Sequence, residues 1–214
     1  MNRVFPIFIL LSALFFSFNI SAATIKVLVL GDNLSSGDGI ERDLQWVRLL
    51  AYKINVNYKK YRVINRSLSG DVTQQSLERL PALLKRYRPK VVIIQMGGND
   101  GLQGLSVNQI ASNLDKMIEI SKDAGARVLL LGMQLPARFG LRYSYQFGKL
   151  YINVADDHNI HMVSLLLRQV ALNSTEENSD TLLVNKNGQE VIFESVWPFL
   201  VPLLNAAEMD RLEE

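Results

Sequence analysis

The chain has 214 residues, of which 48% are hydrophobic and 21% are charged, and 23 Lys and Arg against 21 Asp and Glu give a net charge of +2. This length suits one domain, and the near-neutral charge argues against a nucleic-acid-binding protein, which normally carries a dense basic stripe. The lack of cysteine excludes a disulfide framework, thiolate zinc ligands and a cysteine nucleophile. Two histidines, His158 and His161, are too few for a three-histidine metal site, and no metal or cofactor is expected.

The N-terminus has the layout of a secretory signal peptide. Arg3 precedes a nearly pure apolar run over residues 4–18, and small residues then lead up to Ala23. The run of about 15 residues is short for a membrane span, so cleavage after Ala23 is favoured over an uncleaved anchor. No later segment is expected to cross a bilayer. The prediction is a signal peptide over residues 1–23, export to the periplasm or beyond the cell, and a mature domain over residues 24–214.

Beyond the signal peptide, short β-branched runs alternate with longer segments that have apolar residues at helical spacing. The expected strands cover residues 25–30, 61–65, 91–96, 127–131 and 161–163. The expected helices cover residues 43–54, 72–87, 107–124 and 141–157. Pro81 is expected to mark a local break or a new first turn in the second helix, and Pro198 and Pro202 argue against one straight helix over the apolar residues 187–204. The polar, acidic residues 173–179 predict a surface loop.

This alternation of strands and helices indicates a parallel sheet with helices on both faces. The predicted fold is a single α/β domain, a three-layer α/β/α sandwich around a central parallel sheet of about five strands. In such sheets, ligands bind beyond the carboxyl ends of the strands. Glycine-containing loops at residues 31–33, 69–71 and 97–100 follow the first three expected strands. We therefore expect these three loops to meet at one edge of the sheet.

Four short motifs occur in order along the mature chain. They are GDNLS at residues 31–35, SGD at 69–71, GGND at 97–100 and DTLLVNKNG at 180–188. In this order and spacing they resemble the four blocks of the SGNH, or GDSL-type, hydrolase family. The stretch 69–89 is similar, more narrowly, to the exported bacterial thioesterase–lysophospholipase–arylesterase branch. The resemblance implies a flavodoxin-like sandwich and hydrolysis of esters or thioesters by a serine.

The resemblance also implies a role for each block. In the family the first block supplies the nucleophilic serine, the next two supply a glycine and an asparagine of the oxyanion hole, and the last supplies an aspartate and a histidine. Gly70 and Asn99 match the oxyanion-hole positions, and Asp180 matches the acid of the triad. The nucleophile position holds Asn33 and the histidine position holds Leu183. Both departures fall on residues that make and break bonds.

Other residues are poor substitutes for the missing pair. Ser35 and Ser36 lie two and three positions after Asn33. If a helix starts at Asn33, Ser36 lies about one turn, roughly 5 Å, further along its axis. His158 and His161 lie outside the last block and are expected to face solvent or bond the backbone. Losing the serine or histidine of a triad costs about 10⁶ in turnover, with roughly 10³–10⁴ over water left from the oxyanion hole and binding.

The predicted function is therefore that of a non-catalytic pseudo-hydrolase that binds an acyl or ester small molecule or a lipid. Two alternatives stay open: a slow or unorthodox hydrolase of carboxylic esters, lysophospholipids or acyl thioesters, and a purely structural partner protein. Whether the chain is an enzyme at all is left open, with inactivity favoured. One aromatic group either lines an acyl groove or packs internally, and it comprises Phe139, Tyr143, Tyr145 and Phe147.

Overall fold

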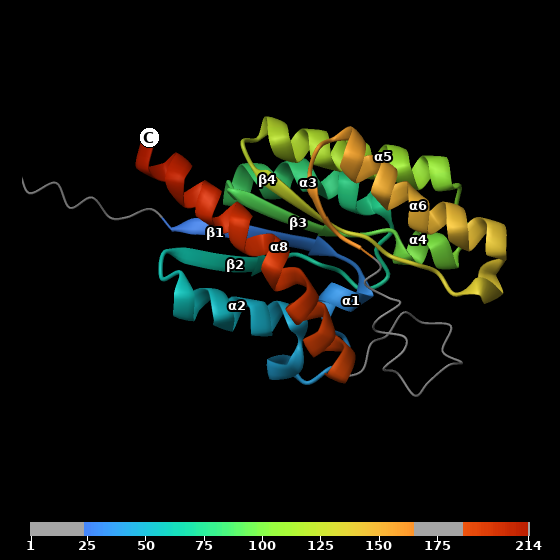
Figure 1. Ribbon diagram of the computed structural model, residues 1–214, viewed down its shortest axis with the longest axis horizontal. Helices are drawn as coiled ribbons and strands as arrows, with labels where there is room; N and C mark the ends of the chain where they lie inside the picture. The colour runs from blue at the N-terminus through green and yellow to red at the C-terminus, as the bar shows by residue number, and fades with distance from the viewer. Residues whose placement is uncertain (1–23, 165–185, 214) are drawn as a thin grey trace, which may run out of the picture.

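The computed structural model describes residues 24–164 and 186–213, and it contains a five-stranded, all-parallel sheet (Figure 1). The strand order is β2-β1-β3-β4-β5. The predicted signal peptide, the predicted loop at residues 173–179, Asp180 and Leu183 lie outside the described residues. The strands are β1 (Ile25–Gly31), β2 (Tyr61–Asn65), β3 (Val91–Gln95), β4 (Arg127–Leu131) and β5 (His161–Val163).

Helices cover both faces of the sheet, which confirms the predicted three-layer α/β/α architecture (Figure 1). One layer contains α2 (Trp46–Asn57) and α8 (Lys186–Glu213). The other contains α3 (Thr73–Tyr87), α5 (Val107–Asp123) and α6 (Leu141–Asp157). Four short elements lie in the loops: α1 (Asn33–Ser36), η1 (Arg42–Leu44), α4 (Gly98–Leu102) and η2 (Ala137–Phe139). The single helix expected over residues 43–54 is divided at Gln45, whose extended backbone (ψ 132°) separates η1 from α2.

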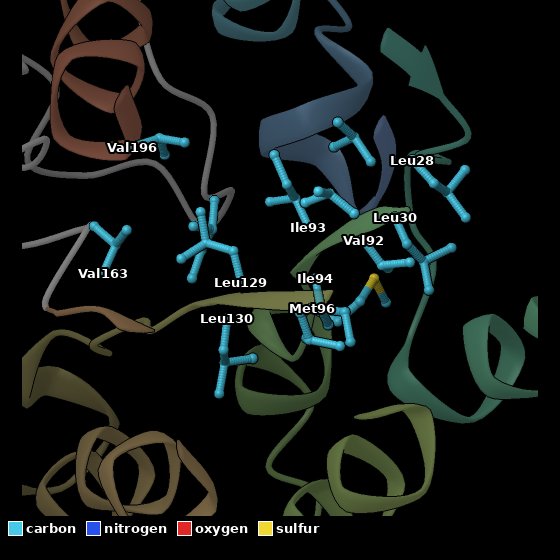
Figure 2. Close-up of a cluster of buried hydrophobic side chains, with 14 of the residues drawn as sticks. Leu28, Leu30, Val92, Ile93, Ile94, Met96, Leu129, Leu130, Val163 and Val196 are labelled. Atoms are coloured by element: carbon cyan, nitrogen blue, oxygen red, sulfur yellow. The ribbon is translucent and has the colours of Figure 1, made fainter. Parts of the chain in front are cut away.

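The core lies on both faces of the central strands, as their continuous apolar sequences require. Every residue of β3 is buried. Figure 2 shows side chains of β1, β3 and β4 packed together with Val196 of α8. Because the middle of the sheet is covered on both faces, the polar residues at the carboxyl ends of β1 and β3 are attached directly to the packed core.

The expected break or new first turn at Pro81 is wrong, and residues 187–204 lie within one helix despite Pro198 and Pro202. The helix α3 continues through Pro81, and α8 is one helix of 28 residues that contains the other two prolines. All three prolines are exposed. A proline costs a helix one backbone hydrogen bond, but on the solvent side water can bond the freed carbonyl. Burial of the opposite face, with Leu80 in α3 and Leu200 in α8, favours the continuous helix.

Contrary to expectation, α8 is long and apolar enough to span a membrane by length and composition alone. Its segment Asn187–Arg211 has 25 residues and few charged side chains. One side of this segment belongs to the domain core, however, with Ile192, Val196, Leu200 and Leu204 fully buried. Packing on the sheet thus explains part of the hydropathy of α8, since 33% of the apolar segment is buried in the domain.

Candidate functional site

Asn33 stands directly after the turn that ends β1. At Gly31 an added Cβ would lie 2.6 Å from the Ser35 side chain, so only glycine fits this turn. The Asp32 carboxylate accepts a hydrogen bond from the Leu34 amide (3.2 Å) and caps α1. Turn and cap together hold Asn33 as the first residue of α1, at the carboxyl edge of the sheet.

The three glycine-containing loops meet at this edge, as predicted, and their polar groups converge on one atom. The side-chain oxygen Oδ1 of Asn33 accepts a hydrogen bond from the Gly70 amide (2.6 Å). The same oxygen accepts a second hydrogen bond from Nδ2 of Asn99 (3.2 Å). Residues 33, 70 and 99 therefore form one cluster, built from the loops after β1, β2 and β3.

Asn99 is held firmly by the loop after β3. Its Nδ2 also donates to the backbone carbonyl of Asp71 (2.8 Å), and its side chain is buried. The residue before α4, Gly97, has a φ of +111°, and a Cβ there would collide with the Tyr151 hydroxyl. That hydroxyl donates to the carbonyl of Met96 (2.9 Å) and so supports the same turn. Packing and backbone geometry thus fix the direction of the Asn99 amide.

The loop after β2 is anchored by charged groups. The Asp71 carboxylate accepts hydrogen bonds from Ser76 Oγ (2.7 Å) and from Arg79 Nη2 (2.6 Å). Two residues later, the Thr73 amide donates to Oδ2 of Asp100 (2.9 Å), which ties this loop to α4. Burial raises the pKa of the Asp100 carboxyl, although the hydrogen bonds from Thr73 partly oppose that effect. Gly70 itself is exposed, with a φ of +79°.

A buried polar network lies directly beneath Asn33. Gln95 Nε2 donates to Asp32 Oδ1 (2.8 Å), while Ser35 Oγ donates to Gln95 Oε1 (2.6 Å). Burial raises the pKa of Asp32 to about 6, because loss of water disfavours the carboxylate more than the Gln95 and Leu34 hydrogen bonds stabilise it. The network thus joins the carboxyl ends of β1 and β3 through residues on either side of Asn33 in the chain.

The hydroxyls near Asn33 are already engaged. Ser35 is buried and points into the network below, and Ser36 Oγ donates to the backbone carbonyl of Asn33 (3.2 Å). Helix α1 does start at Asn33, so Ser36 lies one turn further along, as the sequence suggested.

The two histidines lie away from the cluster. His161 is exposed, as expected, and begins β5, which is three strands away from β1 in the sheet, or roughly 14 Å at the usual strand spacing. His158 differs from the expectation, since its Nε2 lies 3.1 Å from Asp115 Oδ1 rather than bonding the backbone or facing solvent. Neither imidazole can act on Asn33. Within residues 24–164 and 186–213, no group of three His, Asp or Glu side chains is arranged to hold a metal ion.

The aromatic group on and before α6 is divided in its environment. Phe147 is fully buried against Tyr151, with ring centroids 5.4 Å apart, and Tyr143 is half-buried with its hydroxyl bonded to the Leu105 carbonyl (2.7 Å). Tyr145, in contrast, is 67% exposed. Phe139 packs partly against the core. Internal packing therefore accounts for Phe147, while Tyr145 faces outward.

Sequence reasoning missed the residues that support the cluster. Arg79 lies eight positions after Asp71, and Gln95 lies far from Asp32 and Ser35 in the chain. One signal was available: polar Gln95 ends an otherwise apolar strand, directly before the third glycine-containing loop. A buried polar side chain at the end of a central strand needs a partner, and the ends of β1 and β3 are adjacent.

Comparison with known proteins agrees with this geometry. Residues 29–191 match the model of the GDSL-like Lipase/Acylhydrolase family. The chain is 39% identical over 183 residues to Esterase TesA of Pseudomonas aeruginosa, which covers 86% of this chain and 91% of that protein. It is 35% identical over 185 residues to Thioesterase 1/protease 1/lysophospholipase L1 of Escherichia coli K12, covering 86% of this chain and 88% of that protein.

A solved structure of TesA has the same fold. It matches with a TM-score of 0.78 at 38% sequence identity, over 83% of this chain and 99% of that one. The family match spans the three converging loops, and the two curated relatives extend along most of the chain. This chain belongs to the GDSL-like lipase/acylhydrolase family, in its esterase, thioesterase and lysophospholipase group.

Proposed function

We propose that this protein is a non-catalytic member of its family, a pseudo-hydrolase that binds an acyl or ester compound without hydrolysing it. The observation that carries the proposal is the environment of Asn33. Its amide oxygen, rather than a hydroxyl, lies between the Gly70 amide and Asn99 Nδ2. An amide oxygen carries no proton that a base could remove, and it cannot form the acyl-enzyme ester on which serine hydrolysis depends.

Magnitudes favour this function over ordinary hydrolysis. In a serine hydrolase, loss of the nucleophile or of the histidine lowers turnover by about 10⁶, and removing both costs little more because they act as one unit. Asn33 and Leu183 occupy the nucleophile and histidine positions. We therefore expect, at most, the residual rate of a site that only binds and polarises its ligand, which is roughly 10³–10⁴ times the uncatalysed rate in water. Asp180, the acid position, then has no imidazole to orient.

The serine hydroxyls beside Asn33 and the distant imidazoles support the same conclusion. Ser35 and Ser36 donate their protons to Gln95 and to a backbone carbonyl, respectively. An efficient base would have to lie within about 3 Å of one of them, whereas His158 is paired with Asp115. An unorthodox hydrolase built on these serines therefore lacks a base among the described residues.

The ligand is proposed by analogy with the relatives, whose names specify an esterase, a thioesterase and a lysophospholipase. We propose an ester, lysophospholipid or acyl thioester, held at the carboxyl edge of the sheet.

We also propose that the protein is exported and that its signal peptide is removed. Arg3, the apolar run at residues 4–18 and the small residues before Thr24 are typical of a cleaved signal peptide. N-terminal sequencing of protein from the periplasm should begin at Thr24 or within two residues of it, and a full-length product in the membrane pellet would contradict export.

Restoring the missing pair tests the loss of catalysis. The variant Asn33→Ser/Leu183→His should hydrolyse short-chain nitrophenyl esters measurably faster than the parent. Either change alone should recover little, because nucleophile and base act together. The matched control is Asn33→Ala/Leu183→His, which carries the same imidazole without a hydroxyl and should stay inactive. Circular dichroism must first show that both variants fold, since an imidazole in place of leucine can cost about 1–3 kcal/mol. A folded Ser/His variant that is no faster than the control would mean that the site has lost hydrolase geometry.

A further inference from the structure

The hydrogen-bond directions around Asn33 are fixed by chemistry. The Gly70 amide can only donate, and Asn99 Nδ2 can only donate, so the atom that both of them contact must be the acceptor Oδ1 of Asn33. On the other side, Asn99 Nδ2 donates to the Asp71 carbonyl, which can only accept. The chain of bonds therefore has one consistent orientation, and the carbonyl of Asn33 points into the space between the two donors.

The same bonds use every proton that the two donors can offer. Asn99 Nδ2 has two hydrogens, and they go to the Asp71 carbonyl and to Asn33. The Gly70 amide has one, which goes to Asn33 at 2.6 Å. A ligand oxygen can then be bound by this pair only after Asn33 has left it.

Asn33 also resembles the group that such a pair of donors would bind. Its side chain ends in an acyl carbonyl, C(=O)–NH₂, the amide counterpart of an ester C(=O)–OR. Donors that stabilise a developing oxyanion lie about 2.7–3.1 Å from it, and the two donor–oxygen distances here, 2.6 and 3.2 Å, lie just below and just above that range. Asn33 thus combines two changes in one residue: it removes the nucleophile and supplies a substitute carbonyl.

We propose that Asn33 is an internal ligand of the oxyanion hole and that it determines which compounds the site accepts. By occupying the Gly70 and Asn99 donors, it excludes the carbonyl oxygen of an ester and the oxyanion of a tetrahedral analogue. An acyl compound bound to the wild-type protein is therefore held through its chain and not through its carbonyl. The acyl nature of the ligand rests on the proposed function, whereas the occupied hole rests on the geometry alone.

Octylphosphonate, an anionic tetrahedral analogue with an acyl-like tail, is the probe for the test. By calorimetry, Asn33→Ala should bind it at least about tenfold more tightly than the wild type, which corresponds to about 1.4 kcal/mol. The double variant Asn33→Ala/Asn99→Ala should lose this gain, because one donor of the opened hole is gone. Asn33→Ser serves as a second opened variant in case the alanine variant does not fold. Equal affinity of the wild type and a folded opened variant would overturn the proposal.

Nuclear magnetic resonance provides an independent readout without any ligand. In labelled wild-type protein, a scalar coupling across the hydrogen bond should connect the Gly70 amide nitrogen with the side-chain carbonyl carbon of Asn33. Asn33→Ala should abolish that coupling and shift the Gly70 amide proton upfield. Absence of the coupling in the wild type, with a Gly70 resonance unchanged in the variant, would overturn the proposal. Ester hydrolysis by the wild type would refute the proposed function instead, and the coupling tells the two failures apart.

Discussion

The two loops that supply donors to Asn33 are built differently. The loop after β3 is buried throughout Gly97–Asp100, and a side chain at Gly97 would collide with Tyr151. The loop after β2 is exposed at Gly70, where an added Cβ would meet no atom within 4 Å. The Asn99 donor is therefore held by packing, whereas the Gly70 donor is held by the Asp71 anchor and by Asn33 itself. Glycine at position 97 is therefore required by both packing and backbone geometry, whereas at position 70 only the positive φ favours it.

Alanine substitution at the two glycines tests this difference most strongly. Both residues have positive φ values, +111° at Gly97 and +79° at Gly70, so alanine is strained at either position. Gly97→Ala adds a clash with the buried Tyr151 hydroxyl, and we expect a loss of about 3–4 kcal/mol in the free energy of unfolding. Gly70→Ala should cost only about 1–2 kcal/mol. Urea denaturation of the two variants measures both values, and equal losses would contradict the contrast between the loops.

The contribution of the buried Asp32–Gln95–Ser35 network to folding stability should depend on pH. Burial raises the pKa of Asp32 from 3.8 to about 6, so the folded protein keeps a proton that the unfolded chain releases between these values. Stability relative to Asp32→Asn should therefore fall by about 3 kcal/mol as the pH rises from about 3.5 to 7. The asparagine keeps the acceptor for Leu34 and Gln95 but does not titrate. Parallel denaturation of wild type and variant across this range gives the difference, and a difference that grows in the opposite direction would refute the assigned shift.

The anchor of the exposed loop provides a smaller effect with a matched control. Arg79 and Asp71 are 2.6 Å apart and mostly buried, with exposed side-chain fractions of 22% and 10%. Arg79→Ala should lower the free energy of unfolding by about 2 kcal/mol and loosen the loop that presents Gly70. Arg48 forms an exposed pair with Asp43 at 4.0 Å, and Arg48→Ala should cost less than about 0.5 kcal/mol. Faster amide exchange at Gly70 in the Arg79 variant alone would confirm the anchoring role.

Local patterns were enough to predict the layers and the meeting of the three loops. Apolar runs such as residues 91–94, followed shortly by glycine at position 97, specify buried parallel strands, and parallel strands bring their carboxyl ends to one edge. The order of the motifs then identified Asn33, Gly70 and Asn99 as neighbours. These predictions depend on periodicity and topology, which a sequence carries directly.

Other features depend on side-chain orientation, which periodicity does not carry. A break or new first turn was expected at Pro81, and one straight helix was doubted at Pro198, because proline removes a backbone hydrogen bond. Both residues face solvent, where that loss is small, and both lie inside continuous helices. The pairing of His158 with Asp115 and the direction of the Asn33 amide are likewise set by tertiary packing. The occupied oxyanion hole could not be deduced before the three loops were placed in space.

Hydrolysis by the unmodified protein is the most direct test of the account. The measurement is kcat/KM for a nitrophenyl ester and an acyl-CoA thioester with the purified mature chain, beside Asn99→Ala as the variant that removes one oxyanion donor. We expect neither protein to exceed the background rate that both share, because Asn33 cannot attack a carbonyl carbon. Turnover at an ordinary enzymatic rate, between about 1 and 10³ s⁻¹, that is lost in Asn99→Ala would contradict the claim that this site does not catalyse.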